Sequence, residues 1–141
     1  MRKLLEVEVS NLKPTLIDYI TQISDEALDS VYGYGLSTDV KSFGYQANRL
    51  SAIYALHEFF NSDENDIDFV ESIASAIHDG WSYAAYHIND SRYLAQPQKK
   101  VNRTMLADTA YSNLSEQEKE KDRVVSRAII DALKEYQEST N

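Results

Sequence analysis

The chain of 141 residues contains no cysteine. This absence excludes a disulfide framework, a thiolate zinc site, an iron–sulfur cluster and a cysteine nucleophile. Only 4 glycines and 2 prolines are present, although sheet-rich folds need many of both for their tight turns. No apolar run reaches the roughly 18–20 residues that cross a bilayer, and the N-terminal stretch is too charged for a signal peptide. We therefore expect a helical, cytoplasmic protein.

Basic residues are also scarce. The chain has 14 lysines and arginines against 23 aspartates and glutamates, and its net charge is −9. A protein that grips nucleic acid across a broad face needs a basic surplus, so we expect no extended contact with DNA or RNA and none with a membrane. A small anionic ligand remains compatible with this balance, because a few convergent cations can hold a phosphate whatever the net charge.

The spacing of apolar residues predicts four helices in one all-α domain. The third has the clearest signal, with apolar positions at alternating spacings of three and four. The last begins at a capping box in which Ser115 and Glu118 satisfy each other's free N–H groups. The predicted helices run from about Lys13 to Val31, from a cap among Ser37, Thr38 and Asp39 to about Phe60, from Ile67 to Ile88, and from Ser115 to Tyr136.

Two stretches lie outside these helices. Residues 1–9 contain an alternation of Leu5, Val7 and Val9 with Glu6 and Glu8, which predicts a short strand or an extended arm. Residues 89–113 form a long connection, in which Met105, Leu106 and Ala110 favour a short helix.

Enzyme signatures are missing from the sequence. It contains no glycine-rich phosphate loop, no nucleophile elbow and no His-Glu-x-x-His pattern. No two of the three histidines, His57, His78 and His87, are spaced to meet one turn apart on one helix face. We therefore expect no metal, no cofactor and no catalysis. An enzyme that works through His78 is the weakest of the interpretations.

Two groups of residues suit ligand binding. Arg123 and Arg127 are four apart near the start of the last helix, where a guanidinium clamp and the positive helix end would favour a phosphate or carboxylate. The 10 tyrosines offer flat faces that suit a purine ring or a protein interface. For both groups a structural role is the alternative, because tyrosines pack in cores and charged helix residues form solvated faces.

Residues 68–136 resemble the RyR domain, a repeat of ryanodine receptors that also occurs in bacterial and phage proteins. Residues 73–81, Ile-Ala-Ser-Ala-Ile-His-Asp-Gly-Trp, are similar to its Leu-Ala-x-x-x-His-x-x-Trp helix. Residues 110–123 are similar to its Pro-Tyr-x-x-Leu-Ser-Glu-x-Glu-Lys-x-x-Asp-Arg segment, with Ala110 in place of the proline. The family's Gly-Trp-x-Tyr-Gly turn has no clear counterpart after Trp81. Residues 1–67 remain unassigned N-terminal helices of the same domain.

The resemblance implies a recognition module for nucleotide-derived signals and not a catalyst. The residues that match its motifs are His78, Trp81, Tyr111, Lys119, Asp122 and Arg123, to which the helical spacing adds Arg127. We expect the tryptophan-bearing helix and the last helix to lie side by side around a cationic, ring-lined recess for a small anionic, nucleotide-like ligand. A phage-encoded protein of this kind could sequester a host defence signal in the host cytoplasm. The alternative is a protein–protein adaptor or inhibitor with an acidic, tyrosine-rich surface, and a homo-oligomer fits either function.

Overall fold

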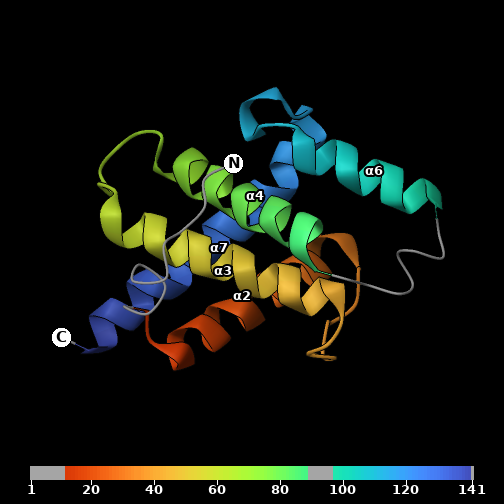
Figure 1. The fold of residues 1–141 in the computed structure, drawn as a ribbon. Coiled ribbons are helices and arrows are strands. Elements are labelled where there is room, and N and C mark those ends of the chain that lie inside the picture. Colours follow the sequence, from red (N-terminus) through yellow and green to blue (C-terminus); the bar gives the residue numbers. More distant parts are fainter. Residues whose placement is uncertain (1–11, 89–96, 141) are drawn as a thin grey trace.

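A computed structural model describes residues 12–88 and 97–140 of the chain (Figure 1). Over these ranges the protein is all-α, as the sequence predicts, and none of the described helices is long and apolar enough to cross a membrane. The predicted strand or arm at residues 1–9 lies outside the described residues. The elements are α2 (Pro14–Tyr32), α3 (Phe43–Asn61), α4 (Phe69–His87), α6 (Pro97–Asp108), the 3-10 turn η1 (Tyr111–Asn113) and α7 (Glu116–Thr140).

Local signals explain most helix ends. Pro14 is the first residue of α2, and Gly33 ends this helix in the left-handed conformation, with a φ of 68°. The Ser115 hydroxyl accepts a hydrogen bond from the Glu118 N–H at 3.2 Å, as the predicted capping box requires. The cap of α3 is Ser42, whose hydroxyl accepts from the Tyr45 N–H.

Two predicted helix starts are wrong. The cap of α3 was expected among residues 37–39, but this segment is non-helical and Ser42 takes the role. The third helix was expected to begin at Ile67, but α4 begins at Phe69 and the Ile67 side chain is 96% exposed. In both places the helix begins at the phenylalanine that enters the core.

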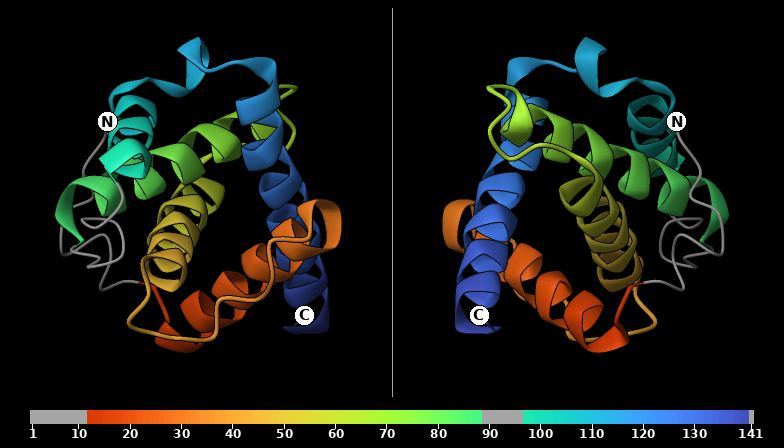
Figure 2. Two further views of the ribbon diagram at one scale, coloured as in Figure 1. Left: turned by 90° about the vertical axis from the view of Figure 1, so that its right-hand side faces the viewer. Right: turned by 90° about the vertical axis from the view of Figure 1, so that its left-hand side faces the viewer.

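The four long helices pack in a closed ring (Figure 2). In order around the ring they are α2, α3, α4 and α7, and each contacts the next. α3 is buried almost all round in its middle, from Ser51 to Leu56, because three other helices pack on it. The side chains at the centre of the core are Ile20, Leu56, Ile73, Ile129 and Leu133.

α3 and α4 make the most intimate contact in the fold. An ideal Cβ at Gly80 would lie 2.6 Å from the Leu50 carbonyl oxygen, so only glycine fits at this crossing. Beside it, the Ser51 hydroxyl donates a hydrogen bond to the Ile77 carbonyl at 3.0 Å. The backbones of α3 and α4 therefore approach closely at Gly80, and this approach sets the position of the next turn of α4.

α6 is a further helix that the sequence predicts only in part. A short helix was expected around Met105 and Leu106, but α6 extends over Pro97–Asp108 and stops before Ala110. It packs against α4, outside the ring of long helices. Its one-sided pattern is weak because most of its residues are polar.

Candidate ligand-binding pocket

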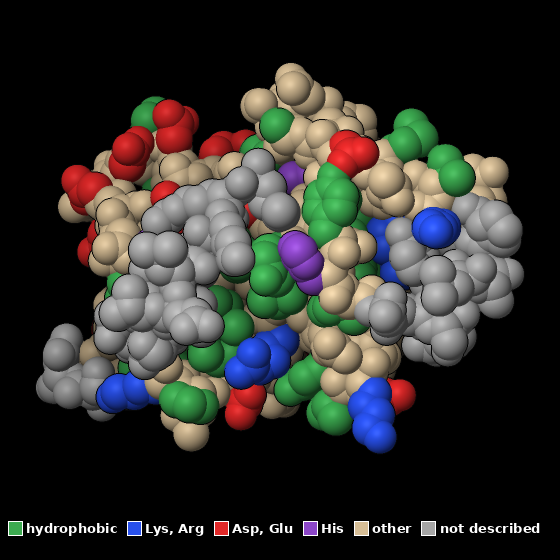
Figure 3. Space-filling view, viewed as in Figure 1, with side chains coloured by type: hydrophobic (Ala, Val, Ile, Leu, Met, Phe, Trp, Pro, Cys, Tyr) green, Lys and Arg blue, Asp and Glu red, His purple; other side chains and the backbone are tan. Residues whose placement is uncertain are grey.

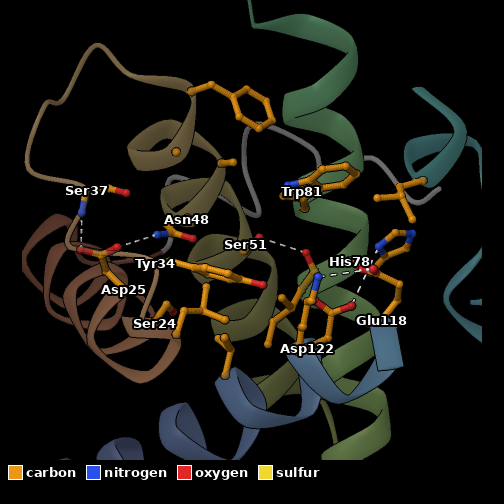
Figure 4. A pocket seen from close by; sticks show the side chains of 18 of the residues that line it. Ser24, Asp25, Tyr34, Ser37, Asn48, Ser51, His78, Trp81, Glu118 and Asp122 are labelled. Atoms are coloured by element: carbon orange, nitrogen blue, oxygen red, sulfur yellow. Dashed lines mark hydrogen bonds and ion pairs between the residues drawn. The ribbon is translucent and has the colours of Figure 1, made fainter. Parts of the chain in front are cut away.

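A pocket of about 340 Å³ lies between α2, α3, α4 and α7 (Figure 4). This volume falls in the range of small-molecule sites, about 300–1,000 Å³. The tryptophan-bearing helix and the last helix do lie side by side and both line it. The polar and aromatic lining residues are Ser24, Asp25, Tyr34, Ser37, Phe43, Asn48, Ser51, His78, Trp81, Glu118, Lys121 and Asp122.

Aromatic rings form one wall of the pocket. The His78 and Trp81 rings are stacked, with centroids 6.1 Å apart and planes 16° apart. Phe43 meets Trp81 edge-on, with centroids 6.3 Å apart. The Arg103 guanidinium lies 3.7 Å from the centroid of the Phe43 ring, so a cation from α6 braces this wall. The wall is therefore rigid, and it presents a flat indole to the pocket.

Tyr34 contributes a further ring from the segment between α2 and α3. It lies between Gly33 and Gly35, which both take positive φ values, 68° and 82°. The Gly33 N–H donates to the Asp29 carbonyl and the Gly35 N–H to the Asp29 carboxylate, each at 2.8 Å. Left-handed backbone on both sides of Tyr34 turns its side chain back into the pocket. Sequence analysis did not single out Tyr34, which lines the pocket.

One end of the pocket is held by Asp25. Its carboxylate accepts a hydrogen bond from the Ser37 N–H at 2.7 Å and one from the Asn48 side-chain amide at 3.3 Å. These bonds tie the segment after α2 to α3, as Figure 4 shows. Sequence analysis also missed Asp25 and Asn48, because nothing local distinguishes them from other polar helix residues.

His78 and Asp122 form the opposite end. His78 Nε2 lies 2.6 Å from the Thr109 carbonyl oxygen, so this nitrogen carries the hydrogen and donates it. Nδ1 of the neutral ring is then an acceptor, and it lies 3.9 Å from Asp122 Oδ2, beyond hydrogen-bond distance. Burial raises the pKa of Asp122 to about 8, helped by the Glu118 carboxylate and opposed by Lys121. At neutral pH this carboxyl is therefore mostly protonated.

The predicted cationic character of the recess is wrong. Among the described lining residues, the carboxyl groups of Asp25, Glu118 and Asp122 face a single cation, Lys121. Lys121 Nζ lies 3.3 Å from a Glu118 carboxylate oxygen, which takes up its charge. A phosphate inside the pocket would meet net negative surroundings at neutral pH, because the carboxylates of Asp25 and Glu118 outnumber the single cation, Lys121.

Arg123 lies outside this pocket, in an ion-pair network on another face of α7. Its guanidinium donates to both Glu71 carboxylate oxygens and, at 2.9 Å, to Glu116. The Tyr111 hydroxyl donates to Glu71 at 2.8 Å. Arg123 lowers the pKa of Glu71 through its hydrogen bonds, whereas burial and the Glu71 carboxylate raise the pKa of Tyr111. Arg123, Glu71, Glu116 and Tyr111 therefore supply hydrogen-bond partners to one another.

The two arginines therefore form no clamp. Arg127 is 52% exposed and donates to Glu120 at 2.8 Å, while Arg123 is held by Glu71 and Glu116. Lys119 Nζ lies 3.5 Å from Glu116 and 5.8 Å from the centre of the Tyr111 ring. Of the predicted site residues, the structure brings His78, Trp81 and Asp122 into the pocket and leaves Tyr111, Lys119, Arg123 and Arg127 outside it.

No family model, curated protein or solved structure matches the chain. The resemblance to the RyR domain therefore stays a prediction. Within residues 12–88 and 97–140, no group of three or more histidines and carboxylates is placed to hold a metal ion.

Proposed function

We propose that the protein binds a nucleotide-derived signal or metabolite without transforming it, and holds it by the base. The observation that carries this proposal is the Trp81–His78 stack, which faces the same pocket as the polar groups of Asn48, Ser51 and Asp122. A planar ring gains a stacking partner there, and its edge atoms gain donors and acceptors.

The charges of the pocket orient such a ligand. Its interior holds the carboxylates of Asp25 and Glu118, which would repel a phosphate. The base therefore goes inside and the phosphates point outward to solvent. This orientation replaces the arginine clamp as the basis for binding. The more specific role, sequestration of a defence signal by a phage-encoded protein in the host cytoplasm, depends on the RyR resemblance alone.

The surroundings of His78 favour binding over turnover. Ser82 Oγ lies 3.5 Å from His78 Nε2, and His78 Nδ1 faces Asp122. The order serine, histidine, aspartate is that of the catalytic triad of many hydrolases. However, Ser82 is buried and does not line the pocket, and the Thr109 carbonyl already occupies Nε2. Ser82 lacks access to substrate, and the histidine nitrogen nearest to it already donates to the Thr109 carbonyl, so the pair supports no acyl transfer through Ser82.

Native mass spectrometry of protein purified from cells with active nucleotide signalling tests the proposal. We expect a nucleotide-sized mass to co-purify, and the same spectra report whether a homo-oligomer forms. Trp81 is the only tryptophan, so its fluorescence reports directly on the pocket during titration with 3′,5′-cyclic AMP, ADP-ribose or nucleosides. Absence of any bound mass together with a flat fluorescence titration would contradict the proposal. Recovery of a chemically altered ligand would contradict its non-catalytic part.

The second candidate function is a protein-binding adaptor or inhibitor, favoured by the loop between α3 and α4. Acidic side chains gather at this end of the molecule (Figure 3), and Ile67 stands 96% exposed among them. The exposed acidic residues of the loop are Asp63, Glu64, Asp66 and Asp68. Such a surface suits a basic protein, and added salt should weaken that complex. Substitution of Ile67 by serine should then weaken it, whereas Trp81→Phe should not.

A further inference from the structure

We infer that Asp122 sets the ligand class by offering one hydrogen-bond donor and one acceptor, so that the pocket selects adenine-type edges. Such an edge places a ring-nitrogen acceptor beside an exocyclic amino donor. This inference rests on the proposed function, because it names the base that the same pocket takes.

The geometry leaves the Asp122 carboxyl available to a ligand. It faces the pocket from α7, beside His78 of α4 (Figure 4), and its side chain is 19% exposed. The 3.9 Å gap to His78 Nδ1 is too long for a hydrogen bond, and no other described residue forms one with this carboxyl. By contrast, the Asp25 carboxylate at the far end is already engaged by Ser37 and Asn48. Among the acidic residues of the lining, Asp122 is therefore the one whose carboxyl can still form hydrogen bonds with a ligand.

The charges around Asp122 favour its protonated form. α4 presents His78, α7 presents Glu118 and Lys121, and the other titratable groups of the lining are Tyr34 and, on α2, Asp25. Lys121 Nζ is 3.3 Å from Glu118, so its charge is directed to that carboxylate. α3 lines the pocket with no charged side chain. Burial and Glu118 accordingly raise the pKa of Asp122 to about 8.

Protonation decides which base edge fits. A neutral carboxyl has one O–H donor and one carbonyl acceptor, the complement of an adenine edge. A carboxylate has acceptors only, and it fits the ring N–H and amino N–H of guanine, which are both donors. The pocket should therefore prefer adenosine while Asp122 is protonated and lose that preference when the carboxyl ionises.

Titrations of Trp81 fluorescence with adenosine and guanosine test this inference. At about pH 9, above the Asp122 pKa of about 8, adenosine affinity should be about tenfold weaker than at about pH 6. Asp122→Asn keeps a donor and an acceptor but does not titrate, so it should bind adenosine at both pH values. Asp122→Leu has neither and should bind adenosine at least about tenfold more weakly at about pH 6. Asp131→Asn, at an exposed position of α7, is the matched control and should behave as wild type.

The outcomes separate this inference from the proposed function. The inference is overturned if Asp122→Asn and Asp122→Leu lose adenosine binding equally, or if the adenosine affinity of the wild type rises with pH. In either case a fluorescence response of Trp81 to nucleosides would still support a base-binding pocket. A flat Trp81 response to every nucleoside and nucleotide at both pH values overturns both. Far-ultraviolet circular dichroism of each variant at each pH identifies any loss of binding that comes from loss of fold.

Discussion

Two neighbouring residues of α7 lie in opposite chemical situations. Arg123 makes hydrogen bonds with Glu71 and Glu116, within a network that also takes up the Tyr111 hydroxyl. Asp122 faces the pocket, and its carboxyl stops 3.9 Å short of His78. Adjacent residues of a helix point about 100° apart, so one side chain reaches an ion-pair network and the next reaches a cavity. Capacity for a ligand remains only where polar groups are left without partners.

The same comparison explains why the charged motif residues misled sequence analysis. A guanidinium near a helix start suits a bound phosphate, but it suits a carboxylate of a neighbouring helix equally well. Glu71 of α4 supplies that carboxylate, and it is 52 positions away in the sequence. The network therefore stabilises the α4–α7 contact, and the pocket lies on another face of α7.

The largest effect is expected at the α3–α4 crossing, on which the pocket wall depends. Gly80→Ala should destabilise the protein by about 3 kcal/mol, because the new Cβ would lie 2.6 Å from the Leu50 carbonyl oxygen. Gly44→Ala is the control: its Cβ would meet only the Ser37 hydroxyl, at 3.0 Å, and should change stability by no more than about 1 kcal/mol. Urea denaturation measures both. Equal stability of the two variants would mean that the helices cross less closely.

Asp122→Asn should stabilise the protein at neutral pH, which sharpens the contrast with the ion-pair network. The folded-state pKa of Asp122, about 8, lies above its ordinary value of 3.8, so ionisation opposes folding as pH rises between these values. The gain over wild type should be absent below about pH 4, grow as pH rises, and exceed about 1 kcal/mol at neutral pH. Thermal unfolding across this pH range measures it. A variant that is less stable than wild type at neutral pH would show that Asp122 is ionised and paired.

Arg123→Ala should destabilise the protein more than Arg127→Ala does, because it removes the cation that serves both Glu71 and Glu116. Arg127→Ala should cost no more than about 0.5 kcal/mol, since this residue is half exposed and pairs only at the surface with Glu120. Neither change should alter ligand titrations of Trp81. Loss of binding in both variants would restore the arginine clamp.

The smallest effect is expected at the edge of the network. Tyr111→Phe removes the hydroxyl that donates to Glu71 and should cost about 1 kcal/mol at neutral pH. The folded-state pKa of Glu71 lies below its ordinary value of 4.5, so its stabilising contribution is present above that value and is lost as pH falls through the lower, folded-state pKa. Acid unfolding of wild type and Tyr111→Phe should therefore converge at low pH. A difference that persists unchanged in acid would mean that the tyrosine acts by packing alone.

The sequence by itself determined where most helices lie. The start of α2 at Pro14, its end at Gly33 and the cap at Ser115 depend on backbone hydrogen bonds between residues a few positions apart. Such interactions are local, and the spacing of apolar residues then identifies the buried face. α6 was incompletely predicted because it packs mainly against α4 and is largely polar, which leaves little apolar pattern.

Only the tertiary structure decided which side chains share the pocket. Asp25, Trp81 and Asp122 belong to three helices, and their distances depend on how α4 is set against α3 at Gly80 and against α7 at Glu71. The same contacts place Arg123 among carboxylates and Asp122 in low-dielectric surroundings, where burial raises its pKa. A residue type and its spacing specify what a side chain can bind. The neighbours that packing supplies decide whether that capacity is already used.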